Sequence, residues 1–232
     1  MWLLFGGRWR AVRVGGVVVG SAGVRCRTGS GVLVRRFLAV VAVLGLVPLV
    51  SVVEPAVVGA SVPSYPSSVG ADSPLHYWRL GETGSPAADS GSGSRSCTGS
   101  GSPAFSSAGL LETDTDTAVS FDGSNHLNCG SFSMSGTTGS IEAWVELDSL
   151  PVASGLIAGT YYFGLRVLDG KPEFLARTTA SSYPRVATAA SPITTGGVHH
   201  VVGTFSGGAM RLYVDGVLTG TASRSGTLGG SQ

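Results

Sequence analysis

The sequence predicts an all-β protein, built as a sandwich of antiparallel strands. Short strand patterns recur from residue 75 onward, with turns between them. Two dipeptides, Asp169-Gly170 and Asp215-Gly216, each stand between two strand patterns, the strongest short-range sign of a hairpin. No stretch after residue 75 shows sustained helical spacing of apolar residues, and 36 glycines disfavour long helices.

The charge of the chain divides it into two parts. Residues 1–60 carry seven arginines against one acidic residue, Glu54, a net charge of +6, whereas residues 61–232 carry eight basic and thirteen acidic residues, a net −5. The acidic second part repels phosphate backbones, so nucleic acid is not an expected partner.

The basic N-terminal part has the layout of an export signal. Arg35 and Arg36 precede the uncharged run 37–53, FLAVVAVLGLVPLVSVV, and small or aliphatic residues at 58–60 predict cleavage after Ala60. Translation is expected to start near Val34. The alternative is an uncleaved membrane anchor, but that requires about 20 apolar residues, and this run has 17 with Pro48 inside it. We therefore expect residues 1–60 to be an N-terminal extension with a signal helix.

Residues 61–74, SVPSYPSSVGADSP, are rich in proline and serine and predict a linker. Strands are predicted after it at 75–80, 117–121, 140–147, 161–168, 171–178, 199–205, 210–214 and 217–221. In the third of these strands Ile141, Ala143, Val145 and Leu147 share the face expected to be buried.

The segment 81–109 has almost no large apolar residue and predicts a long, solvated loop, with a binding loop as the less favoured alternative. Cys97 and Cys129 are the cysteines outside the extension, and an exported chain favours a disulfide between them. Two free buried thiols are the alternative. A zinc site is disfavoured because no paired Cys-x-x-Cys spacing is present.

Five motifs follow one another in the order of a known family: YWRLGE with AADSG (77–82 and 87–91), TAVSFDG (117–123), SIEAWV (140–145), HHVVGTF (199–205) and MRLYVDGVL (210–218). Together they resemble the laminin-G-like domains of the concanavalin A-like jelly-roll family, over residues 75–232. The resemblance implies two curved antiparallel sheets in a secreted or cell-surface protein. It also implies a mostly non-catalytic domain that binds carbohydrate or protein, in some members with calcium.

The chain departs from the family pattern at two places. Val198 stands where the family usually has tryptophan before the histidine-containing strand. The family also continues with a strand that closes the sheet beside the first strand, and no such strand follows residue 226. We therefore expect the domain to be truncated at its C-terminus, and the strand 75–80 to lack a neighbour.

Two features invite a catalytic interpretation. Glu142-x-Trp144-x-Glu146 resembles the Glu-x-Asp-x-Glu strand of laminarinase-type glycoside hydrolases, whose period-2 spacing aims the acids into one cleft, but tryptophan replaces the central aspartate. His199 and His200 are adjacent on a strand, so they point to opposite faces, one expected towards the core and the other towards solvent, and they cannot chelate one ion. We predict that the chain is not an enzyme.

Calcium is the one cofactor that the sequence suggests. Asp89 and Asp122 are loop carboxylates suited to this ion, and Glu112, Asp114 and Asp116 form a further acidic cluster whose plainer interpretation is a solvated loop.

Aromatic side chains are the expected tools of a sugar-binding face, because they stack on the apolar faces of sugar rings. The candidates are Tyr183, in a loop beside Pro184, and Trp144, Tyr161 and Tyr162. The favoured function is a secreted or surface recognition module, exported by a bacterial type of signal, for carbohydrate or an extracellular protein. The alternatives are a glycoside-active enzyme of the same fold and a structural or adhesion spacer.

Overall fold

The computed structural model describes residues 2–4, 12–20, 64–112, 114–131, 134–149 and 155–229. These parts contain one helix, α1 (Tyr65–Ala71). The strands are β1 (Trp2–Leu4), β2 (Val12–Gly20), β3 (His76–Trp78), β4 (Thr98–Ser100), β5 (Ala104–Ser107), β6 (Ala118–Phe121), β7 (His126–Asn128), β8 (Thr138–Leu147), β9 (Gly155–Gly159), β10 (Phe163–Leu168), β11 (Lys171–Ala176), β12 (Arg185–Thr188), β13 (Val198–Ser206), β14 (Ala209–Val214) and β15 (Val217–Ser223).

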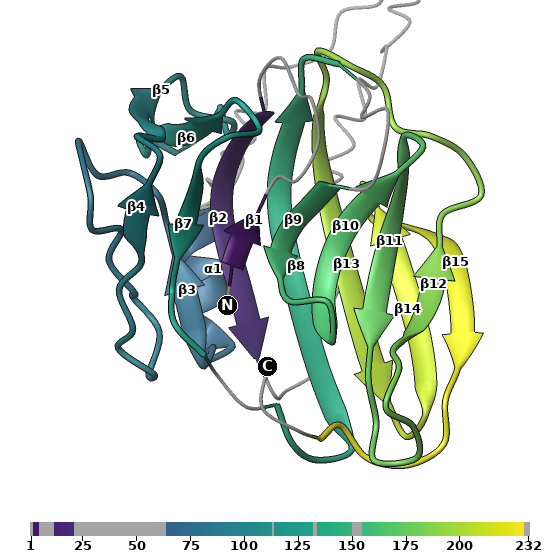
Figure 1. The fold of residues 1–232 in the computed structure, drawn as a ribbon. Helices are drawn as coiled ribbons and strands as arrows, with labels where there is room; N and C mark the ends of the chain where they lie inside the picture. Colours follow the sequence, from purple (N-terminus) through teal and green to yellow (C-terminus); the bar gives the residue numbers. More distant parts are fainter. Residues whose placement is uncertain are drawn as a thin grey trace, which may run out of the picture.

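The strands form a two-layered sandwich, and every strand pair in it is antiparallel (Figure 1). The larger sheet has the order β15-β14-β13-β8-β2-β6-β5, with β3 also paired to β2. A four-stranded sheet, β12-β11-β10-β9, packs against it, and β1-β7-β4 form a small third sheet. The predicted antiparallel β-sandwich is thus confirmed.

An apolar core of buried side chains fills the space between the layers. The predicted inner face of β8 is correct, because Ile141, Ala143, Val145 and Leu147 are all fully buried. The rings of Phe163 and Phe174 meet edge to face, with centroids 5.5 Å apart. A β-carbon added at Gly203 of β13 would lie 2.3 Å from the ring of Phe174, so glycine there lets the two sheets approach closely.

Both predicted hairpin turns are present. Asp169 and Gly170 have φ of 50° and 76°, and Asp215 and Gly216 have φ of 51° and 79°. Positive φ at both central residues is what a tight two-residue hairpin turn requires.

The strand β2 differs most from the sequence-based expectation. It lies between β3 and β8, with Val17 opposite both Trp78 and Ala143. The first predicted strand therefore has a neighbour, which comes from the segment assigned to the N-terminal extension. The valine-rich run VRVGGVVVG suits a strand, but its place upstream of the apolar segment hid it. The apolar run 37–53 and the cleavage site at Ala60 lie outside the described residues.

The expected linker 61–74 contains the helix α1. Ser64 caps the helix, its hydroxyl accepting a hydrogen bond from the backbone N–H of Ser67 at 3.4 Å, and a proline stands in the first turn. Val69 is buried and packs with Tyr77 and Tyr65. The same prolines and serines that suggest a linker therefore begin a helix. No described helix is long and apolar enough to span a membrane.

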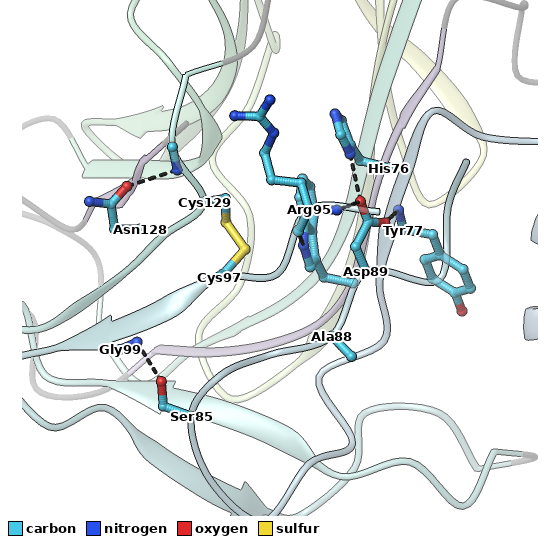
Figure 2. Close-up of a disulfide and its surroundings, with 12 residues drawn as sticks. His76, Tyr77, Ser85, Ala88, Asp89, Arg95, Cys97, Gly99, Asn128 and Cys129 are labelled. Carbon is cyan, nitrogen blue, oxygen red and sulfur yellow. Dashed lines mark hydrogen bonds and ion pairs between the residues drawn. A yellow bond between two sulfur atoms is a disulfide. The ribbon is translucent and has the colours of Figure 1, made fainter. Parts of the chain in front are cut away.

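The segment 81–109 is more ordered than a solvated loop. It contributes β4 and β5, and Ala87 and Cys97 form a bridge through both of their backbone N–H groups. The predicted disulfide between Cys97 and Cys129 is confirmed (Figure 2). Both cysteines are buried, and the bond ties the segment to the end of β7. Closing a loop of 32 residues stabilises the fold by roughly 3–4 kcal/mol on the chain-entropy model.

Candidate ligand-binding site

Two of the predicted aromatic residues lie together in the turn between β9 and β10. Thr160 shapes this turn: its hydroxyl accepts hydrogen bonds from the backbone N–H groups of Tyr162 and Phe163 at 3.1 and 3.2 Å. Tyr161 is 55% exposed, and its ring meets that of Tyr162 edge to face, with ring centroids 5.7 Å apart. The turn thus presents Tyr161 to solvent and holds Tyr162 against the ring of Tyr161.

Arg177, directly after β11, contacts the second of these tyrosines. Its guanidinium carbon lies 4.0 Å from the centroid of the Tyr162 ring, a cation–π contact, and its backbone N–H donates to the carbonyl of Tyr162 at 2.7 Å. The β9–β10 turn and the start of the β11–β12 loop are therefore joined side by side.

Tyr183 stands in the β11–β12 loop and is 73% exposed, the highest exposure among the large apolar side chains described. Its backbone N–H donates to the hydroxyl of Ser181 at 3.2 Å, and its carbonyl accepts from Nη2 of Arg224 at 3.0 Å. The loop rejoins the sheet where Arg185 pairs with Ala176.

We call the loops that carry Tyr161, Tyr162 and Tyr183 the tyrosine end of the sandwich. The antiparallel strand order puts it at the lower end in Figure 1, with the β13–β14 turn and the segment after β15. Exposed aromatic rings on loops that a sheet positions suit the recognition of a sugar or a protein surface.

Trp144, the fourth predicted aromatic, lies elsewhere. It projects from the face of β8 opposite the core, stacked on the ring of His200 with centroids 4.4 Å apart. The ring of Tyr65 from α1 meets it edge-on at 5.7 Å. The sequence predicts this face of β8, but it cannot predict that a helix from the preceding segment covers it.

The two glutamates of the same face are also covered. Glu142 is 4% exposed and Glu146 is 8% exposed. One carboxylate oxygen of Glu142 accepts a hydrogen bond from the Tyr65 hydroxyl at 2.8 Å, and the other lies 3.5 Å from Nε2 of His200. Burial, and then the negative charge of Glu142, raise the pKa of Tyr65 well above its usual value, so the phenol stays a donor to Glu142.

Replacing Tyr65 by phenylalanine tests how tightly α1 closes this face. The variant keeps the ring contacts but leaves a buried carboxylate with one donor fewer. We expect the free energy of unfolding to fall by about 1.5–3 kcal/mol in urea titrations, the range for hydrogen bonds to charged groups. Tyr161→Phe is the matched control and should change stability little. Equal stability of both variants would contradict the assignment.

The predicted calcium ligands are both engaged in hydrogen bonds. The side chain of Asp89 is fully buried, with Oδ2 2.6 Å from Nδ1 of His76 (Figure 2). Asp122 is exposed and accepts from the backbone N–H and the hydroxyl of Ser124, at 2.9 and 2.7 Å, which lower its pKa. The described residues contain no group of three or more histidine, cysteine or acidic side chains that could hold a metal ion.

The remaining acidic cluster and the histidine pair also have structural partners. Asp116 and Asp114 lie 2.5 and 3.8 Å from the guanidinium of Arg79. His199 lies between the hydroxyl of Thr194 at 2.9 Å and the carboxylate of Asp215 at 2.8 Å. His199 is thus held by hydrogen bonds, and His200 stacks on Trp144 on the outer face of the sheet. Neither ring lies in the apolar core, and neither is without a partner.

The family comparison agrees with this geometry. Residues 121–231 match the family model described as the concanavalin A-like lectin/glucanases superfamily. These residues belong to that superfamily. Searches of the curated proteins and of the solved structures found no match to the chain. The concanavalin A-like region begins in β6, so the whole tyrosine end lies within it.

Proposed function

We propose that this protein is a non-catalytic recognition module that binds carbohydrate or an extracellular protein through the tyrosine end. The observation that carries the proposal is the exposure of Tyr161 and Tyr183, at 55% and 73%, on loops fixed by neighbouring strands. Membership of a superfamily that includes lectins supports carbohydrate as the ligand.

The site of action that we propose is outside the cell or at its surface. The buried disulfide between Cys97 and Cys129 supports an oxidising compartment, and the uncharged run 37–53 after Arg35 and Arg36 supports export. Asp89 and Asp122 stay candidate calcium ligands. Unfolding in calcium and in a chelator tests that role, since a bound ion raises the melting temperature.

A second candidate is a glycoside-active enzyme that uses Glu142 and Glu146, since the superfamily also includes glucanases. Both carboxylates are buried, and Glu142 also accepts a hydrogen bond from Tyr65. This burial favours the non-catalytic alternative, because an acid–base pair must reach the substrate. Release of sugar from β-glucans by the full chain, lost in Glu142→Gln, would support the enzyme instead.

Tyr183→Ala is the variant that tests the recognition proposal. We expect it to weaken binding to the best ligand of a glycan and matrix-protein array about tenfold, equivalent to about 1.4 kcal/mol, because a stacked ring is lost. The measurement is a titration of that ligand by calorimetry.

The matched control is Val217→Ala, which removes a 63% exposed apolar side chain at the opposite end of the sandwich and should leave affinity unchanged. Binding that Val217→Ala weakens and Tyr183→Ala does not would place the site elsewhere. An array without any bound ligand would favour a structural spacer.

A further inference from the structure

The two ends of the sandwich differ in charge. The loops at the tyrosine end, 159–162, 177–185, 206–209 and 223–229, contain three arginines, Arg177, Arg185 and Arg224, and no aspartate or glutamate. The turns at the opposite end contain Asp148, Asp169 and Asp215. Residues 61–232 carry a net charge of −5, so the positive end is a local feature that opposes the charge of the domain.

Two arginines of this end, Arg177 and Arg224, donate to backbone carbonyls. Arg224 donates from Nη2 to the carbonyl of Tyr183 at 3.0 Å, and its buried Nε has no hydrogen-bond partner among the described residues. Arg177 lies over Tyr162 and donates to the carbonyl of Gly229 at 3.4 Å. The carbonyl of Tyr183 orients the guanidinium of Arg224 without neutralising its charge.

Two arginines elsewhere in the fold form ion pairs with acidic residues. Arg79 and Arg166 each have a carboxylate oxygen 2.5 Å from Nε, from Asp116 and Glu173. Neither Arg185, which is exposed, nor Arg224 forms an ion pair with an acidic residue of the described ranges. Positive charge is thus left for a ligand at the end where the tyrosines are exposed.

We propose that the tyrosine end binds an acidic polysaccharide. This inference rests on the proposed function and names the ligand class of the same site. Sugar rings stack on Tyr161 and Tyr183, and the acidic substituents pair with Arg185 and Arg224, whose planar guanidiniums match the oxygens of a carboxylate or a sulfate. The alternation of aromatic and cationic side chains over two loops suits a chain of sugar rings that carries repeated acidic groups.

The experiment measures the binding of the full chain to three probes by calorimetry. The probes are polygalacturonate for carboxylates, dextran sulfate for sulfates, and unmodified dextran as the neutral polysaccharide. We expect at least one acidic probe to bind about tenfold or more tightly than dextran, and its affinity to fall as salt rises from about 50 to 500 mM.

The variants Arg185→Gln and Arg224→Gln each remove one of the charges. We expect each to weaken acidic binding about three- to fivefold, and the double variant about tenfold or more, with a smaller dependence on salt. Lys171→Gln, which removes one positive charge at the opposite end, is the matched control and should bind as the unmodified chain. Arg185 is exposed, so its variant keeps the test valid if Arg224→Gln lowers stability.

The outcomes separate the two proposals. Equal binding of dextran and the acidic probes, unaffected by the arginine variants but weakened by Tyr183→Ala, overturns the acidic ligand and leaves the recognition module in place. Polyglutamate serves as a fourth probe, and its binding without binding of any polysaccharide also overturns the acidic polysaccharide as the ligand. A chain that binds no probe and no ligand of the array overturns both proposals.

Discussion

A chain that starts at Ser61 is expected to lose its cooperative unfolding transition, because it lacks β2. This strand pairs with β8 on one side and with β3 and β6 on the other, so its removal opens the larger sheet at its middle. Val19 is also fully buried in the core. Unpaired backbone groups and a gap in the core together cost on the order of the whole stability of a domain, 5–15 kcal/mol.

The comparison is made by circular dichroism and calorimetry on three chains: the full chain, residues 11–232, and residues 61–232. The middle chain loses β1 and keeps β2, so it should still melt cooperatively and serves as the control. The shortest chain should bind apolar dyes and aggregate, and a synthetic peptide of residues 11–21 should restore part of its transition. A sharp, reversible melt of residues 61–232 alone would contradict the central position of β2.

The position of β2 in the larger sheet limits where an export signal can be cleaved. Cleavage after Ala60 would remove β2 together with the signal, so cleavage there and a larger sheet with β2 at its middle exclude each other. Mass determination of the exported protein therefore decides between a cleaved signal and an N-terminal segment that stays with the domain.

Local patterns predicted the parts of the fold that depend on few neighbours. The alternation in β8 identified its core face, and the two Asp-Gly turns identified two hairpins, because side-chain period and turn geometry are set within a few residues. The neighbours of β2 could not be predicted in this way. Val17 and Trp78 are separated along the chain by a segment whose strongest local signal, an apolar run, predicts export rather than pairing.

In the candidate site, too, the sequence predicts local features but not contacts between distant segments. The sequence places Tyr183 beside Pro184 in a loop, and it is exposed there. The alternation of side chains predicts Trp144 on the outer face of its strand, but its contact with Tyr65 depends on segments that are distant in the sequence. A sum of charge along the chain does not show the positive charge of the tyrosine end. Arg177 and Arg185 belong to one loop, but the antiparallel order of the strands is what brings Arg224 to the same end.

Replacing Asp89 by alanine is the second change with a large expected effect. Oδ1 accepts hydrogen bonds from the backbone N–H groups of Tyr77 and Gly91, both at 2.8 Å, and Oδ2 accepts from that of Arg95 at 2.7 Å and lies 2.6 Å from His76 (Figure 2). Alanine at position 89 removes the acceptor of all these donors. Because the Asp89 side chain is fully buried, water cannot easily replace it. We expect the free energy of unfolding in urea to fall by about 3–5 kcal/mol.

The pH dependence of stability provides an independent test of the same network. Burial opposes ionisation of Asp89, but the hydrogen bonds from Arg95, His76, Tyr77 and Gly91 more than offset it, so the pKa of Asp89 is lowered. A carboxyl group with a lowered pKa stabilises the fold above its unfolded pKa of about 3.9, and this contribution is lost as the pH falls through the lower folded value. The unmodified chain should therefore lose stability below about pH 4 more steeply than Asp89→Ala.

Asp122→Ala, which removes an exposed carboxylate, is the matched control and should change the free energy of unfolding by less than about 1 kcal/mol. Equal stabilities of the Asp89 and Asp122 variants, with parallel pH profiles, would show that Asp89 does not organise this loop.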